Sequence, residues 1–592
     1  MKPMHSGPIR SCLRPLARAL PLLLILTLIL IPGSVSAQGD RFFVPSDGFT
    51  RAKDLPDDFT GTVRSVQLDI KDAFEGSTIH SDAEKKLFDI GNDLHMESRP
   101  GTIRRRLLFH EGDTITKNLL LETEKALRNE EFLADAIIEV MPWKDGTVHI
   151  KVITYDQWTT VPGFSIQRLG GEWIYIFGPV ESNLLGTGQR LGFFVGHDQF
   201  RDTRWLDYNN NALSSKRLRL AAHTAWLSDG YNIQFSLSKP LESRTSLYGF
   251  SASLSAMELS EQVYLDANAL DTLSDSLADA MSGTGRVLAQ FNSVATHDLD
   301  LSVTRSFGYK TKFNVSPTFN RRDRYNHGGR LFRNDSLGRA LPLDPTARFP
   351  NERRDYLLGV SVSLYRFDFK TVQNFNNLKW SETLETGWRL STKAAKNQEW
   401  MGARNDDYLL SHSAVYNNAW WDAVFFNSSA SLRYYVGPDS GMDDGYASGY
   451  SEVQWKPIWL TSTFLSVSWV NLFASEKSQQ LILGEENGLN GYPNFYYAGQ
   501  ARILIEAEQR LFPRFEVGTV VPALAVFANA GNTFAEYDDF ETDELHYSLG
   551  LGLRLGASKT VQKLVNHVNL AWPIGEKRLS GPVFSIRVKT SL

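Results

Sequence analysis

Apolar and polar residues alternate with a period of two along most of the chain. In 547–556 one face is unbroken leucine (Leu549, Leu551, Leu553, Leu555) and the other carries Ser548, Gly550, Gly552 and Arg554. The run 189–196 alternates in the same way, with Leu191, Phe193 and Val195 on one side. Such alternation is typical of strands with one apolar face and one wet face. Between Trp158 and Leu592 these runs follow one another, separated by turns rich in Gly, Asn, Asp and Ser, which predicts a large antiparallel β structure.

Charged residues occupy the polar face of the runs near the C-terminus. In 501–511 that face carries Arg502, Glu506, Glu508 and Arg510, and in 583–592 it carries Ser585, Arg587 and Lys589. A lysine or arginine facing lipid near the bilayer midplane would cost about 2–4 kcal/mol, so these side chains indicate a wet lumen. At roughly 25–30 residues per strand with its loop, 158–592 predicts an antiparallel transmembrane β-barrel of about sixteen strands.

Closure of this barrel would bring its first strand, about 161–168, against its last, 583–592. The apolar face of the last strand supplies the candidate seam residues Phe584, Ile586, Val588 and Leu592. Two insertions are expected to be surface loops, 266–282 and 321–353. Asp271, Asp275 and Asp279 in the first have helical spacing. A solvated helix face is the favoured interpretation of these aspartates, with a calcium site as the alternative.

The segment 62–157 has a different texture and predicts a small α+β domain. A strand begins at Thr62, an amphipathic helix covers 117–131, and two further strands are joined by a turn at 144–146. A shorter helix precedes them and carries the basic run Arg104-Arg105-Arg106. A solvated helix face is the favoured interpretation of this run, and contact with acidic lipid or a partner is the alternative.

The N-terminal residues have the pattern of an export signal. A basic front, an apolar core from about Ala19 to Ile31 and the small residues Val35-Ser36-Ala37 predict a signal peptide over 1–37. The only cysteine, Cys12, falls within it, so no disulfide is expected in the exported chain. Residues 38–61 are polar and rich in Gly, Pro and Asp, and are interpreted as a linker.

Composition and motifs exclude several classes of function. The formal net charge of −5 is small for 592 residues and argues against a nucleic-acid partner. The sequence contains no G-x-S-x-G, H-E-x-x-H or P-loop motif, and its twelve histidines lack ligand spacing. An enzyme, a metal centre and a bound cofactor are therefore not expected.

Two stretches of the chain resemble known families. The order of elements over 62–157, with the phrase "RRRLLFHEGD…LLLETEKALRNEEFLADAIIEV", resembles a polypeptide-transport-associated (POTRA) domain. The stretch 156–196, above all Asn183-Leu184-Leu185-Gly186-Thr187-Gly188, resembles the entry into the barrel of the BamA/TamA family, the bacterial surface antigen family of outer-membrane assembly and translocation proteins. The resemblance to the BamA/TamA family covers nearly all of the expected mature chain.

A glycine-rich loop before the 501–511 strand extends the resemblance. In the family, a long sixth extracellular loop folds into the barrel and carries a G-(V/L)-R-G-(F/Y) tip. The corresponding residues here are Gly488-Leu489-Asn490-Gly491-Tyr492, so Asn490 stands where the family has arginine. The acids that would pair with that arginine correspond to Glu508 and Asn529. Because an asparagine pair can hydrogen-bond without charge, we expect Asn490 to reach Asn529 or Glu508; the alternative is a plain turn residue with left-handed angles.

The resemblance implies a protein of the Gram-negative outer membrane with one periplasmic POTRA domain. It implies a role in inserting or translocating unfolded outer-membrane or secreted polypeptides, by β-augmentation at the POTRA domain and a lateral opening at the barrel seam. Outer-membrane lipids and accessory lipoproteins would be its other partners. A dedicated secretion pore or accessory homologue for one partner, and a passive porin, are the alternatives that the sequence leaves open.

Overall fold

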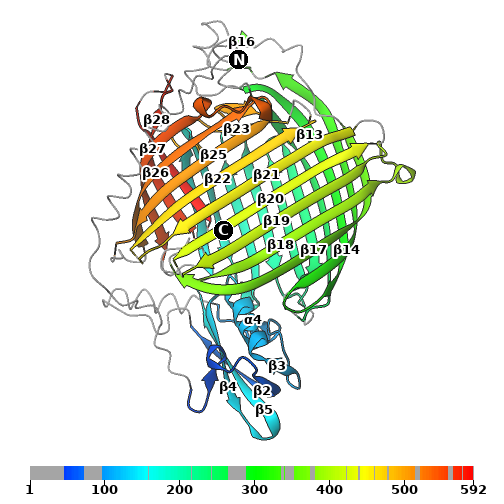
Figure 1. Ribbon diagram of the computed structural model, residues 1–592, viewed down its shortest axis with the longest axis vertical. Coiled ribbons are helices and arrows are strands. Elements are labelled where there is room, and N and C mark those ends of the chain that lie inside the picture. The colour runs from blue at the N-terminus through cyan, green and yellow to red at the C-terminus, as the bar shows by residue number, and fades with distance from the viewer. Residues whose placement is uncertain are drawn as a thin grey trace, which may run out of the picture.

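The computed structural model describes most of the chain after residue 45 (Figure 1). The described residues are 46–72, 96–157, 159–214, 217–241, 243, 245–264, 288–331, 333–334, 339–340, 352–373, 381–421, 423–437, 441–458, 460–475, 479–513, 520–557, 564–576, 578–579 and 581–590. The predicted signal peptide, the segment 266–282 with its aspartates, and Leu592 lie outside them. So do residues 38–45 of the predicted linker.

A closed antiparallel barrel of twenty strands makes up most of the molecule. Its strands are β6 (Thr160–Leu169), β7 (Glu172–Glu181), β8 (Gln189–His197), β9 (Asp202–Asn210), β10 (Arg219–Leu227), β11 (Gly230–Lys239), β12 (Tyr248–Tyr264), β13 (Leu288–Phe307), β14 (Lys312–Leu331), β17 (Arg353–Gln373), β18 (Ser381–Asn397), β19 (Tyr408–Trp420), β20 (Val424–Gly437), β21 (Gly441–Trp455), β22 (Thr461–Phe473), β25 (Ala501–Leu511), β26 (Val520–Phe534), β27 (His546–Ala557), β28 (Leu564–Ile574) and β29 (Val583–Thr590). Each pairs with its neighbours in chain order, and β29 returns to β6.

The prediction of about sixteen strands was wrong. It assumed 25–30 residues for each strand with its loop, whereas β6 to β11 are only nine or ten residues long and are joined by short turns. The predicted surface loop at 321–353 was also wrong in its first third, because β14 continues to Leu331. The short strands and short turns at the start of the barrel therefore raise the count above the predicted one.

The outer wall of the barrel is apolar. Alternate residues of successive strands expose large apolar side chains, among them Phe193, Leu254, Leu390, Leu465 and Leu551. The residues between them in sequence point to the inside. On β27, for example, Arg554 is buried on the face opposite to exposed Leu549 and Leu551. A closed ladder with an apolar outside satisfies its backbone groups within lipid. Among the described residues, no helix is both long and apolar enough to cross a bilayer.

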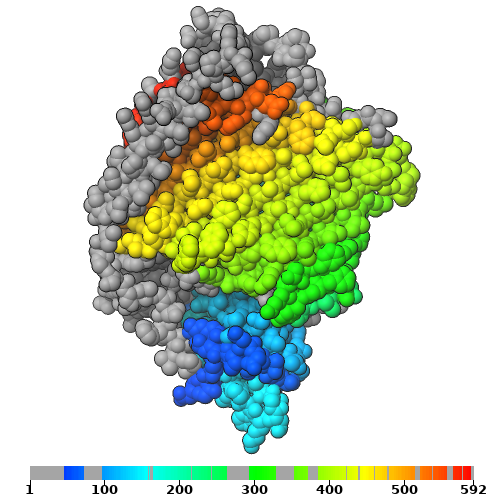
Figure 2. Space-filling view, in the orientation of Figure 1, coloured from blue at the N-terminus to red at the C-terminus, as the bar shows by residue number. Residues whose placement is uncertain are grey.

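Below one end of the barrel lies the small α+β domain, blue and cyan in Figure 2. Its sheet has the order β1-β4-β5-β2-β3, with β1 (Thr50–Arg51), β2 (Thr60–Lys71), β3 (Thr114–Thr116), β4 (Leu133–Pro142) and β5 (Thr147–Asp156). Two helices, α3 (Pro100–Arg104) and α4 (Lys117–Arg128), accompany the sheet. The barrel end next to this domain is called the domain-side rim, and the other end the distal rim.

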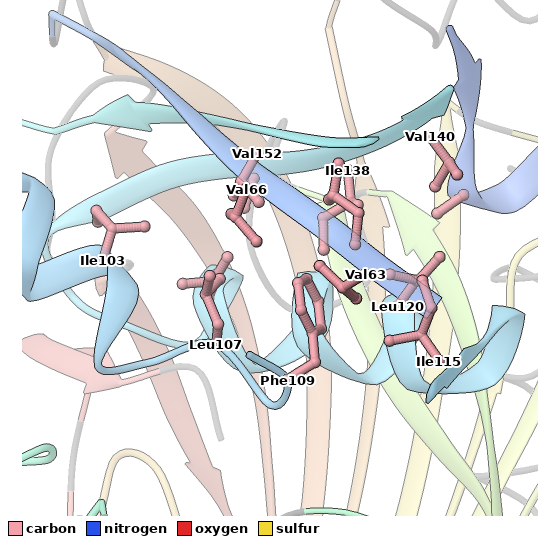
Figure 3. Close-up of a cluster of buried hydrophobic side chains, with 14 of the residues drawn as sticks. Val63, Val66, Ile103, Leu107, Phe109, Ile115, Leu120, Ile138, Val140 and Val152 are labelled. Carbon is pink, nitrogen blue, oxygen red and sulfur yellow. The ribbon is translucent and has the colours of Figure 1, made fainter. Parts of the chain in front are cut away.

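Helix α4 forms because its sequence supplies a cap at the N-terminus and apolar residues along one face. The Thr116 side chain accepts a hydrogen bond from the amide of Leu119 and caps the N-terminus. Leu120 and Leu127, two turns apart, are fully buried against the sheet. Figure 3 shows the resulting core, in which Leu120 and Ile115 face Ile138 and Val140 of β4.

The N-terminal part of this domain differs from the prediction of a linker over 38–61. Residues 46–61 belong to the domain. The short strand β1 pairs with Glu139 and Val140 of β4, and Ala52, in the 3-10 turn η1 (Ala52–Asp54), is fully buried in the core. The polar composition of this segment concealed two buried apolar residues, Ala52 and Leu55.

The remaining elements are small. They are the 3-10 turns η2 (Lys144–Gly146), η3 (Leu184–Gly186), η5 (Glu399–Met401), η6 (Tyr537–Asp539) and η7 (Thr542–Glu544), and the hairpins β15 (Arg333–Asn334) with β16 (Arg339–Ala340) and β23 (Leu481–Leu483) with β24 (Tyr497–Gly499).

The turn 183–188, between β7 and β8, docks the barrel onto the domain. The carbonyl of Gly186 accepts hydrogen bonds from the amide of Arg99 at 2.9 Å and from the hydroxyl of Thr102 at 2.8 Å. The guanidinium of Arg106 donates to the carbonyl of Gly188 at 2.9 Å. Asn183 donates to the hydroxyl of Ser98 at 3.0 Å. The motif that carried the family resemblance is therefore the joint between barrel and domain.

Arg104 and Arg105 are exposed, as expected for a solvated face, but this joint corrects that interpretation for Arg106. Arg106 is 4% exposed. Its guanidinium pairs with Glu130 at 3.0 Å and lies 4.8 Å from the ring centroid of Phe132. Gly188 has a φ of +64°, and a Cβ there would lie 2.6 Å from the Arg106 guanidinium. The close approach requires glycine for both reasons.

We predict that Gly188→Ala loosens the joint. The new Cβ would meet Arg106 and Phe132, so trypsin should cleave after Arg104 to Arg106 faster than in the parent protein. Gly575→Ala is the matched control, because Gly575 also has a positive φ, +85°, but a Cβ there meets nothing within 4 Å. Equal cleavage rates in the two variants would contradict a joint that depends on close packing.

Candidate functional site

The connection between β22 and β25 folds back into the lumen. Its buried residues Leu483, Leu489, Tyr492, Tyr496 and Tyr497 form a cluster against Leu504 of β25. The loop is the eighth connection at the distal rim, whereas the family resemblance predicted the sixth. The difference arises because the barrel has four more strands before the loop than the predicted sixteen-stranded barrel. Five strands follow the loop to the end of the barrel. We call residues 479–500 the lumen loop.

The tip of the lumen loop is held by an amide pair. The side-chain amide of Asn490 donates to Oδ1 of Asn529, on β26, at 2.8 Å. The same oxygen accepts a hydrogen bond from the hydroxyl of Ser548 at 3.2 Å. Asn490 does not have a positive φ, so it does not adopt the left-handed angles of the alternative interpretation. The two amides lie where the resemblance gives an arginine and an acid.

Neighbouring tip residues fit closely against the wall. Gly488 has a φ of +111°, and a Cβ there would lie 2.6 Å from the Leu504 side chain. Gly491, with a φ of +87°, lies against Ala571 of β28. The Tyr492 hydroxyl donates to the carbonyl of Tyr547 at 3.1 Å. Leu489 and Tyr492 are both fully buried, so the tip packs against strands β25 to β28.

Glu508, the remaining acid of the predicted set, does not contact Asn490 through any hydrogen bond that the structure shows. Its carboxylate accepts two hydrogen bonds from Arg554 of β27, at 2.8 and 3.1 Å, and one from Arg510 at 2.5 Å. Arg554 is 2% exposed and also donates to Asn569 at 2.7 Å. A bidentate arginine satisfies a buried carboxylate well. The resemblance predicts an arginine on the loop as the partner of this acid. Here the partner is Arg554, on the barrel wall.

Sequence reasoning placed Arg554 on the polar face of its strand but gave it no role. Its position opposite Glu508 depends on the register of three strands, β25, β26 and β27, which alternation alone does not determine. The sequence feature that could have indicated this role is a single arginine within a run of leucines and glycines. A charge retained on an otherwise small and apolar strand needs a partner.

The seam between β6 and β29 is the weakest junction of the barrel. Among the described residues it has one Cα pair, Ile586 with Arg168, whereas β28 and β29 pair from Leu564 to Ala571. Side chains of β6 bind part of the remaining backbone of β29. The guanidinium of Arg168 donates to the carbonyl of Phe584 at 3.0 Å, and the side chain of Gln167 accepts from the amide of Val588 at 3.2 Å.

The predicted seam residues are thus found at this junction, except Leu592, which lies outside the described residues. Phe584 exposes its ring on the outer wall, as the alternation predicted, while Ser585 is buried. Ile586 makes the one Cα pair with β6, and Val588 donates its amide to Gln167. Along 584–588, β29 therefore contacts β6 side chains at Phe584 and Val588 and the β6 backbone at Ile586.

The lumen loop contacts both seam strands from the inside. The side-chain amide of Asn494 donates to the carbonyl of Leu169, at the end of β6, at 3.0 Å. On the other side, the guanidinium of Arg587 of β29 donates to the carbonyl of Glu485. The carboxylate of Glu485 is fully buried and accepts the amide of Gly491 at 3.0 Å. The loop therefore spans the seam, and its base and tip are held together.

Several solved structures align with most of this chain, at low identity. No family model matches the chain, and no curated protein matches its sequence. BamA from Haemophilus ducreyi, solved without POTRA domains 1–3, aligns over 90% of this chain and 84% of its own, with 12% identity and a TM-score of 0.37. CdiB from Acinetobacter baumannii aligns over 99% of both chains, with 10% identity and a TM-score of 0.42.

The FrpB iron transporter from Neisseria meningitidis also aligns, over 88% of this chain and 91% of its own, with 8% identity and a TM-score of 0.38. This chain is similar to BamA and CdiB. At such identities the likeness extends to a large β-barrel and to no substrate or partner, so function has to be inferred from the residues of this chain.

We predict that Arg554→Met destabilises the barrel by about 3–5 kcal/mol, because it leaves the buried Glu508 carboxylate short of its bidentate partner. The midpoint of heat unfolding, followed by gel mobility, should fall. Adding Glu508→Gln should recover most of the loss. Arg404→Met is the control, since Arg404 and its partner Glu352 are both exposed and such pairs contribute about 1 kcal/mol or less. Equal shifts for Arg554→Met and Arg404→Met would contradict the role given to Arg554.

Proposed function

We propose that this protein is an outer-membrane barrel that assists the insertion or translocation of other outer-membrane or secreted polypeptides through a lateral seam. The observation that carries the proposal is the β6–β29 junction. Every other pair of neighbouring barrel strands shares at least five Cα pairs within the described residues, and this one shares a single pair. A closed barrel normally removes its edges, so an incomplete closure needs a reason.

The incomplete seam would serve as a template for an incoming strand. Backbone groups of β29 that lack a strand partner can pair with an extended polypeptide, as in β-augmentation. Arg168 and Gln167 occupy two of these groups through side chains. Side-chain contacts can be exchanged without breaking a backbone ladder. The seam is therefore closed in a way that a competing strand could replace.

The small domain would lie in the periplasm and act as a POTRA domain. Its fold, two helices on a mixed sheet with a parallel β2–β5 pair, supports that assignment. One sheet edge is occupied: β1 covers Glu139 and Val140, and the Glu124 carboxylate accepts the amide of Ile138 at 2.7 Å. On the other edge, β3 covers β2 only over Thr60–Thr62. Further along β2, the amide of Val66 donates to Glu111 at 3.2 Å and its carbonyl accepts from Arg104 at 3.3 Å. Within the described residues, the part of β2 after Val66 is therefore the better place for an added substrate strand.

The alternative of a secretion pore dedicated to one partner rests on the same geometry. A single small domain precedes the barrel in the described chain, which offers one strand edge rather than a series. A passive porin fits less well, because the lumen loop packs against β25 to β28 and against both seam strands. Accessory lipoproteins and outer-membrane lipids stay among the expected partners, and no enzymatic activity is proposed.

A disulfide across the seam tests the proposal. The only native cysteine is Cys12, within the predicted signal peptide, so Arg168→Cys with Ile586→Cys adds the sole pair to the rest of the chain, at directly opposed positions. We predict that the oxidised variant loses its ability to support export or insertion in cells, measured from the outer-membrane and secreted proteomes, and that a reductant restores it.

The control locks a junction that is already continuous. Leu553→Cys with Val568→Cys joins β27 to β28 at opposed positions and should leave both proteomes unchanged. Loss of many outer-membrane proteins in the locked seam variant would favour general assembly, and loss of one secreted protein would favour the dedicated pore. Unimpaired function of the fully oxidised seam variant would overturn the lateral mechanism.

A further inference from the structure

A cavity of about 370 Å³ lies between the small domain and the inner wall of the domain-side rim. We call it the vestibule. It is lined on one side by α4 and its flanking residues, and on the other by β10, β14, β17 and β18 with the turns next to them. Figure 1 shows α4 directly beneath the barrel. The volume is in the range of ordinary ligand sites.

The lining of the vestibule is strongly basic. It contains seven basic side chains, Arg106, Lys125, Arg217, Arg219, Lys310, Lys312 and Arg389, against three acidic ones, Glu122, Glu130 and Glu385. The whole chain, by contrast, has a formal charge of −5. A concave site with charge of one sign concentrates ligands of the opposite sign.

Ion pairs within the lining neutralise part of this charge. Glu130 pairs with Arg106 at 3.0 Å, and Glu385 pairs with Lys125 at 3.1 Å. The excess of basic over acidic residues therefore persists after these pairs are formed. Lys310 and Arg389, which belong to different parts of the rim, are both exposed. The positive charge of these two side chains is thus accessible from the cavity.

Aromatic rings support several of these cations. The guanidinium of Arg389 lies 5.1 Å from the ring centroid of Tyr365 and 5.0 Å from that of Phe367. The ammonium of Lys125 lies 3.2 Å from the ring centroid of Phe369. Cations held over rings keep their outer face available for an anion. Rings and cations side by side suit a ligand with both carboxylates and apolar groups.

The vestibule faces the lumen and not the lipid. Tyr365 pairs with Arg389 across β17 and β18. Their sequence neighbours Leu364 and Leu390 expose their side chains on the outer wall, so alternation turns Tyr365 and Arg389 inward. A lipid headgroup in the surrounding bilayer would not reach this wall directly. A chain passing between the small domain and the lumen would.

We propose that the vestibule binds an acidic segment of an unfolded polypeptide on its way from the small domain to the barrel. This inference rests on the proposed function and adds a substrate class to it: segments that carry Asp or Glu together with aromatic or aliphatic side chains. Lys310 and Arg389 contact the carboxylates, and the rings at positions 365, 367 and 369 contact the apolar groups. Binding should weaken as salt rises.

The test uses the purified full-length protein in neutral-lipid nanodiscs and a fluorescent unstructured peptide rich in Glu and Tyr. Fluorescence anisotropy should show saturable binding of this peptide and at least about tenfold weaker binding to the double variant Lys310→Glu with Arg389→Glu. Arg404→Glu, a charge reversal at the exposed distal rim, should bind as the parent does. Gel mobility before and after heating establishes that each variant is folded.

Three results would overturn this inference. Equal binding of a peptide with Lys in place of each Glu would exclude charge recognition, and unchanged binding by the folded double variant would exclude the vestibule. Displacement of the peptide by inorganic phosphate or by phosphatidylglycerol in the nanodisc, with the same dependence on Lys310 and Arg389, would assign the site to a phosphate group. The seam disulfide tests a different part of the protein, so failure of either idea is distinguishable from failure of the other.

Discussion

One Cα pair, Ile586 with Arg168, completes the backbone ladder of a twenty-stranded barrel. Because no water is present in lipid to bind free backbone groups, a spanning sheet normally closes along the whole length of its strands. Here closure depends instead on side chains of β6 and on a loop inside the lumen. The arrangement holds the barrel closed with a single backbone pair at this junction, and in the function proposed above it would leave the junction open to exchange.

The lumen loop acts from within as a brace for that junction. Its tip is fixed by the Asn490–Asn529 amide pair, and its base binds β29 through Arg587 and β6 through Asn494. A neutral amide pair avoids the desolvation that a buried ion pair would require. The charged contact in the same region is moved into the wall, where Arg554 binds Glu508. The loop therefore contributes a neutral hydrogen bond, and the wall contributes the ion pair that an arginine on the loop would otherwise make.

Much of this architecture could be predicted from the sequence, because a period of two is a strong local signal. It predicted the outward leucines of 547–556 and the inward Arg587. Helix and strand patterns together predicted the order of elements before Trp158, and the family resemblance singled out Asn490. Strand number could not be predicted well, since short strands with tight turns and long strands with loops give the same total length. The partner of Glu508 and the burial of Arg106 depend on register and docking, which bring together residues distant in sequence. The polar segment 46–61 joins the domain core through a few apolar residues, Ala52, Leu55 and Phe59.

Amide hydrogen exchange of the purified protein in nanodiscs measures the central claim most directly, because it compares junctions within one molecule. The account predicts that amides of β29 (Val583–Thr590) and the facing amides of β6 exchange much faster than those of β27 (His546–Ala557), which is paired on both sides. Equal protection of β29 and β27 would show that the seam is as firmly closed as the rest of the barrel, and would contradict a lateral opening at this place.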